Sequence, residues 1–109
     1  MSQAPAAPKQ EFLLPDPSVL VQAAKLSVQL DRPIQMDYYS DTAQQKAFLV
    51  EDTENDKKKV LLKSRDEFTS YISKTFRVGD DFLIVTENSI YIVSGKIVKR
   101  KIQLSSLEQ

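Results

Sequence analysis

The sequence predicts a mainly β domain, an antiparallel meander curled into a small barrel or sandwich and preceded by a short helix. Strand-like runs follow one another with short turns from Thr75 to Leu104. Within this stretch, Phe82–Val85 and Ile90–Val93 are rich in β-branched and aromatic residues and are too short for helices. Both glycines, Gly79 and Gly95, fall at predicted turns.

Length and composition indicate one domain with one core. The chain has 109 residues, of which 41% are hydrophobic and 28% charged, values typical of a folded globular protein. Residues 1–11 are rich in Ala, Pro and Gln and predict a flexible tail. We expect the β-rich domain to span residues 12–104, and residues 105–109 to form a flexible C-terminus.

A helix is predicted to begin at Asp16-Pro17, with the aspartate as N-cap and the proline at the first helical position. Apolar residues spaced three and four apart support it to about Ala24. From Leu26 to Leu30 apolar and polar residues alternate, which predicts a strand. Since Leu26 and Leu30 also fit the helical face, the alternative is a helix that continues to Leu30.

Three further strands are expected before residue 64. Ile34, Met36 and Tyr38 alternate with polar residues, which predicts a strand followed by a loop at Ser40–Thr42. Ala47–Val50 and Val60–Leu62 form the next strand pair, joined by the polar loop between them.

Residues 65–75 are ambiguous. Ser64 and Glu67 have the spacing of a capping box, whereas the residues that follow favour strand. We predict one or two helical turns from Arg65 that become strand by about Ser73. A full helix from Arg65 to Thr75 would make the fold α+β instead.

The two central strands are predicted to meet at the turn Thr86–Ser89, with Asn88 in the left-handed conformation. Four apolar residues in succession mean that both faces of each strand are covered. Gly95-Lys96 suits a two-residue hairpin loop, which would place Val98 opposite Val93 and Arg100 opposite Tyr91. The cations of this last strand predict an edge strand.

The residue types argue against an enzyme. The chain has no Cys, which would supply a thiolate ligand, and no His, the commonest metal ligand and general base. We therefore expect no cofactor. Asp52, Glu54 and Asp56 have the early spacing of a calcium loop, but Lys57 and Lys63 stand where that loop needs Gly and Glu. No apolar run reaches the length of a membrane span, and the start of the chain lacks the apolar core of a signal peptide, so we expect an intracellular protein.

Two surfaces are candidates for binding. Residues 57–109 carry eleven basic and six acidic side chains, against four and nine in residues 1–56. A small nucleic-acid-binding domain would use the basic edge, where cations hold phosphates and an aromatic ring stacks on a base; its residues are Lys96, Lys99, Arg100, Lys101 and Tyr91. A structural or adaptor protein, the first hypothesis, would contact a partner protein through Phe12, Leu13, Leu14 and Tyr39.

Three segments carry a resemblance to a known set of proteins. Pro33-Ile34 leading to Asp37-Tyr38-Tyr39, then Ser64–Ser70, and above all Val85–Ser94 resemble short uncharacterised proteins of giant nucleocytoplasmic DNA viruses. The resemblance spans roughly Ile34 to Ile102, and its motifs are strand and turn residues. It implies a viral protein made in the infected cell and packaged as a minor virion component, with no functional residue to carry over.

Overall fold

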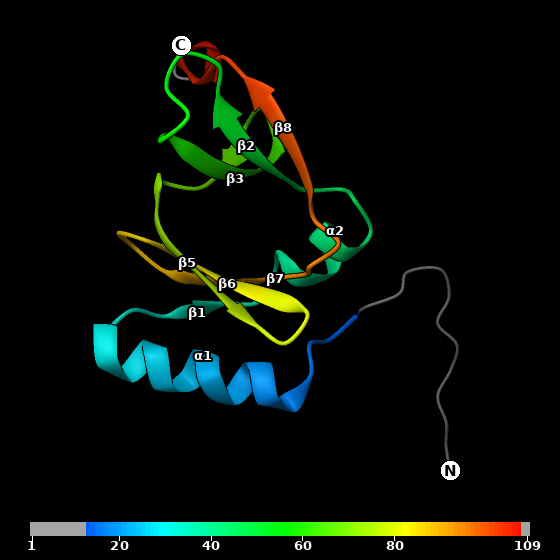
Figure 1. The fold of residues 1–109 in the computed structure, drawn as a ribbon, viewed down its shortest axis with the longest axis vertical. Helices are drawn as coiled ribbons and strands as arrows, with labels where there is room; N and C mark the ends of the chain where they lie inside the picture. The colour runs from blue at the N-terminus through cyan, green and yellow to red at the C-terminus, as the bar shows by residue number, and fades with distance from the viewer. Residues whose placement is uncertain (1–12, 108–109) are drawn as a thin grey trace.

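The computed structural model describes residues 13–107, which form two four-stranded sheets packed face to face (Figure 1). Sheet A has the strand order β1-β7-β6-β5, and sheet B has the order β4-β3-β2-β8. The elements are α1 (Pro17–Leu30), β1 (Ile34–Gln35), α2 (Tyr39–Ala43), β2 (Phe48–Asp52), β3 (Lys59–Ser64), β4 (Glu67–Phe68), β5 (Ile72–Val78), β6 (Asp81–Thr86), β7 (Ile90–Val93), β8 (Val98–Ile102) and the 3-10 helix η1 (Leu104–Leu107). The predicted mainly β class is confirmed, as a sandwich and not a closed barrel.

Helix α1 lies across the outer face of sheet A and is longer than predicted (Figure 1). The strand expected at Leu26–Leu30 is wrong, and the alternative of a continuous helix is correct. Leu26 and Leu30 pack with the buried Val19 and Ala23 on sheet A, because their three- and four-residue spacing puts them on one helical face. Asp31 ends the helix in the left-handed conformation, with φ 56°.

The strand predicted to reach Tyr38 stops after two residues, and the loop predicted at Ser40–Thr42 lies within helix α2. The prediction failed because a long-range partner favours the helical turn here. The Thr42 hydroxyl donates to the Tyr38 carbonyl at 2.7 Å and accepts the Ser94 N–H at 2.9 Å. The alternation of apolar and polar residues from Ile34 to Tyr38 therefore predicts correctly only the short strand β1.

The meander of β5, β6 and β7 is confirmed, with β6 and β7 in the interior of sheet A. Leu83 and Val85 face α1 while Ile84 faces sheet B, so both faces of β6 are covered as predicted. The left-handed conformation predicted for Asn88 is wrong. The Thr86 hydroxyl instead accepts the N–H groups of Asn88 and Ser89, which closes the turn without positive φ.

Strand β8 leaves sheet A, so the predicted hairpin at Gly95-Lys96 is wrong. It joins β2 in parallel, with Val98 opposite Phe48 and Arg100 opposite Val50. Strand β1 likewise runs parallel to β7. The chain crosses between the sheets three times: from A to B through α2, from B to A between β4 and β5, and from A to B at Ser94-Gly95. The predicted edge position of β8 is confirmed.

Residues 65–75 contain no helix, so the predicted helical turn from Arg65 is wrong. The Ser64 hydroxyl accepts the Asp66 N–H at 3.2 Å, and this tight turn brings Glu67 opposite Ser64 in the β3–β4 hairpin. The strand predicted from Ser73 is confirmed within β5, and the β2–β3 pair is confirmed as antiparallel.

The core has three layers. One lies between α1 and sheet A, the second between the two sheets, and the third between sheet B and η1. The middle layer contains Tyr38, Ala47, Leu61, Ile84 and Val93, all buried, and holds the sheets together. No helix within residues 13–107 has the length and hydropathy that a membrane crossing requires.

Candidate protein-interaction site

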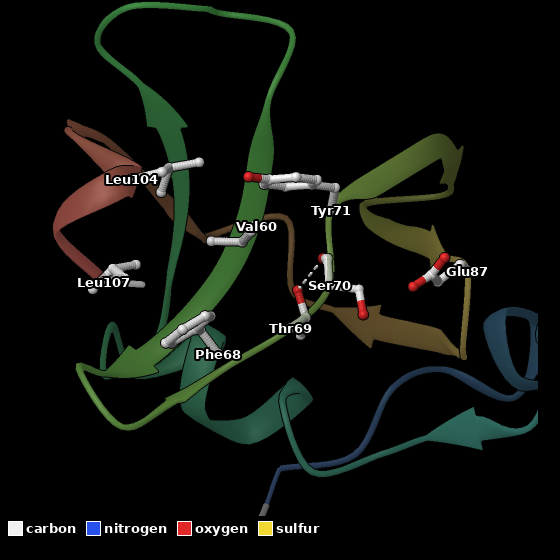
Figure 2. Close-up of a pocket in the computed structure, with 8 residues that line it drawn as sticks. All are labelled: Val60, Phe68, Thr69, Ser70, Tyr71, Glu87, Leu104 and Leu107. Carbon is white, nitrogen blue, oxygen red and sulfur yellow. Dashed lines mark hydrogen bonds between the residues drawn. The ribbon is translucent and has the colours of Figure 1, made fainter. Parts of the chain in front are cut away.

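An apolar groove opens where the β4–β5 connection passes sheet B (Figure 2). We call it the aromatic groove; it is lined by Val60, Phe68, Thr69, Ser70, Tyr71, Glu87, Leu104 and Leu107 and has a volume of about 270 Å³. Phe68 and Tyr71 are 37% and 44% exposed. The groove thus combines a hollow with two accessible aromatic side chains.

Distant parts of the chain build this groove. Val60 comes from β3, Phe68 from β4 and the two leucines from η1, which folds back onto sheet B. Thr69 fixes the β4–β5 connection against β3, because its hydroxyl donates to the Ser70 carbonyl at 2.8 Å and accepts the Leu61 N–H at 3.0 Å. The groove wall is therefore held by hydrogen bonds before any partner arrives.

The rim of the groove carries charge of both signs. The Lys58 ammonium lies 5.5 Å from the centroid of the Tyr71 ring. The Glu87 carboxylate is exposed and forms no ion pair with another residue in the described range 13–107. Asn88 beside it donates to the Ser70 hydroxyl at 2.8 Å, which ties the β6–β7 turn to the rim. Glu87 is thus a positioned carboxylate available to a cation.

The predicted basic surface is only partly assembled. Lys99, Arg100 and Lys101 are exposed together on β8, where the Arg100 guanidinium stacks 4.3 Å from the Phe48 ring centroid and Lys101 lies 3.9 Å from Glu51. The prediction that Tyr91 lies beside Arg100 is wrong. Tyr91 is half-buried in sheet A, edge-on to Tyr38 at 5.2 Å, and burial raises the pKa of its hydroxyl.

Lys96 lies apart from β8, at a second cleft of about 550 Å³ between the start of α1 and the β5–β6 turn. Leu14 and Tyr39, two predicted partner contacts, also line this cleft, while Leu13 is exposed nearby in sequence and Phe12 lies outside the described residues. The Tyr39 hydroxyl donates to Asp81 at 3.3 Å, and Asp81 accepts the Gly95 N–H. The Tyr39 hydroxyl, the Asp81 carboxylate and the Gly95 amide therefore pair within the protein.

Lys63 lies at the centre of a cluster of three carboxylates. Its ammonium lies 3.2 Å from Asp37, 3.4 Å from Asp41 and 3.6 Å from Glu67, and 4.5 Å above the Tyr38 ring. Burial, the largest single influence, acts to lower the pKa of Lys63, but the hydrogen bonds and charges of Asp37, Asp41 and Glu67 together outweigh it and raise that pKa. Burial, then the charge of Glu67, raises the pKa of Tyr38. The cluster is an ion-pair network that joins α2 to sheet B.

Sequence reasoning missed the aromatic groove. The sequence predicts helical turns from Arg65 in the segment that contains Phe68 and Tyr71, and a flexible C-terminus that includes Leu107. The signal available was the apolar pair Leu104 and Leu107, three apart after the last strand. Among residues 13–107 no group of three or more His, Cys, Asp or Glu is placed to hold a metal ion.

Comparison of the chain with protein-family models, with curated proteins and with solved structures found no match.

Proposed function

We propose that the protein is a non-enzymatic structural or adaptor module that binds a partner protein by taking one apolar side chain into the aromatic groove. The observation that carries the proposal is the pair of half-exposed rings, Phe68 and Tyr71, on either side of an apolar hollow. Exposed aromatic side chains beside a pocket are the usual anchors of protein interfaces.

The size of the groove favours a side chain over a small-molecule ligand. A cavity of about 150 Å³ accommodates benzene, and pockets for drug-sized molecules occupy about 300 to 1,000 Å³. At about 270 Å³ the aromatic groove lies between these values and fits one large aliphatic or aromatic side chain with its adjoining backbone. The exposed Glu87 carboxylate at the rim favours a basic residue next to that anchor. The occupant is therefore a peptide segment with an apolar anchor flanked by Lys or Arg.

Peptides selected from a phage-displayed library on the full chain should share this anchor pattern and lose affinity when the groove is altered. Tyr71→Ala should weaken their binding by about 30-fold, which corresponds to about 2 kcal/mol for a central aromatic contact. The affinities of the peptides for the unaltered chain and for the Tyr71→Ala variant are measured by isothermal titration calorimetry. Because Tyr71 is half-exposed, the melting temperature should change little.

Phe76→Ala is the matched control, since Phe76 is an equally exposed ring on β5, outside the groove. Selected peptides that bind the Tyr71→Ala variant as tightly as the unaltered chain would contradict the proposal. Peptides without an apolar anchor would do the same.

The resemblance to proteins of giant nucleocytoplasmic DNA viruses supports a virus particle as the setting for this adaptor. The minor-virion role and the intracellular location stay predictions from the sequence.

The nucleic-acid hypothesis also stays a prediction, now limited to β8, where Lys99, Arg100 and Lys101 are exposed together. If phosphates bind there, single-stranded DNA should be retarded in a mobility-shift experiment at 50 mM salt and largely released at 200 mM, because binding releases counterions. Lys99→Glu with Lys101→Glu should abolish the shift. A mobility shift of the DNA that changes neither with salt nor with these two substitutions would count against binding at the basic edge.

A further inference from the structure

Strand β5 is the longest open edge in the described part of the chain. It spans seven residues, Ile72–Val78, and closes sheet A on the side away from β1. The other outer strands are β1 and β4, of two residues each, and β8, of five. An open edge presents backbone N–H and C=O groups that an extended peptide can pair with.

The side chains of β5 make this edge selective. Lys74 and Phe76 lie opposite Val85 and Leu83 and so share the α1 face of sheet A. Arg77 lies opposite Phe82 on the other face, with its guanidinium 5.5 Å from that ring. Both cations are exposed, Phe76 between them is 39% exposed, and β5 contains no acidic residue. The edge therefore offers one positive charge on each face and one apolar contact.

These features act against a second copy of the chain as occupant. Two antiparallel β5 strands would bring two lysines and two arginines along one seam, and like charges across a strand pair are destabilising. The register shift between Ile72 and Lys74 also breaks the ladder and shortens the regular part to Lys74–Val78. Self-pairing is thus opposed, while an acidic partner strand meets complementary charge.

We propose that the edge of β5 binds an acidic, extended segment of a partner protein as an added antiparallel strand. Read in its own direction, the segment places an acid opposite Arg77, an apolar residue opposite Phe76, any residue opposite Thr75 and an acid opposite Lys74. Its pattern is acid, apolar, any, acid. This surface is distinct from the aromatic groove, so either can bind without the other.

The probe is the capped peptide Val-Glu-Ile-Thr-Asp-Val, titrated into the isotopically labelled full chain and followed by nuclear magnetic resonance. Backbone amide shifts and slowed hydrogen exchange should concentrate on β5. A peptide with both acids replaced by lysine should bind at least tenfold more weakly, as should Lys74→Glu combined with Arg77→Glu, since two attractive pairs become repulsive.

Lys99→Glu with Lys101→Glu is the matched control, because it reverses two cations on the other basic edge, β8; it should leave the affinity unchanged. Tyr71→Ala should also leave it unchanged, which separates this proposal from the groove. Shifts centred on β8 or on the groove would overturn the proposal, as would equal binding of the acidic and lysine peptides.

Discussion

Gly95→Ala should destabilise the protein by on the order of 3 kcal/mol or more, enough to unfold much of the population of a marginally stable domain. A Cβ at this position would lie 1.8 Å from the Asp80 carbonyl oxygen and 3.0 Å from its carbon, both backbone atoms. Relief would require the backbone to move. That movement is opposed because the Gly95 N–H donates to Asp81 and the Ser94 N–H to Thr42.

Gly79→Ala provides the comparison. Gly79 has φ +61°, a conformation that costs an alanine about 1 kcal/mol, but no atom lies within 4 Å of the added carbon. Urea denaturation of both variants, followed by circular dichroism, gives the two losses in free energy of unfolding. Equal losses would show that the crossing at Gly95 has room for a side chain and that its path over Asp80 is wrong.

The same crossing explains where prediction from the sequence stopped. The β5–β6–β7 meander could be predicted because each turn joins strands that pair with their sequence neighbours. Gly95-Lys96 has the residue types of a hairpin loop, and no local signal distinguishes such a loop from a crossing to another sheet. The partner of β8 is β2, and five strands, β3 to β7, lie between them along the chain.

The prediction of the helical regions failed for a related reason. Alternation at Leu26–Leu30 and at Ile34–Tyr38 is compatible with either period over so short a stretch, and tertiary contacts decide between them. Packing on sheet A favours the helix in the first case. In the second case the strand ends at Gln35, and the bond between Thr42 and Ser94 favours the helix α2 that follows at Tyr39.

The candidate site could be predicted least. Exposed cations on an edge strand follow from the residue types of β8 alone, and Lys99, Arg100 and Lys101 are exposed on such a strand, although in sheet B and not beside β7. The aromatic groove depends on η1 folding back to bring Leu104 against Val60, a contact between residues far apart in the chain. Tyr39 stays a predicted partner contact; its hydroxyl donates to Asp81 within the protein.

Leu61→Ala should cost about 2 to 5 kcal/mol of the free energy of unfolding, the range measured for removing buried leucine side chains. Leu61 is 0% exposed and contacts the middle layer, where sheet A contributes Ile84 and Val93. Neither sheet can close the resulting cavity alone, because the outer layers hold both sheets in place. Leu14→Ala makes the same chemical change at a side chain that is 76% exposed, and it should be nearly neutral.

The way in which the Leu61→Ala variant unfolds is as informative as its stability. The middle layer joins the sheets into one core. Within each protein, the unaltered chain or the variant, the amide signals of Val85 in sheet A and Val50 in sheet B should therefore disappear together as the urea concentration rises. Sheet B carries the aromatic groove and sheet A carries the β5 edge, so a shared transition would mean that both proposed surfaces depend on this layer. Loss of the sheet B signals at lower urea, with sheet A intact, would show instead that the two sheets are separate folding units.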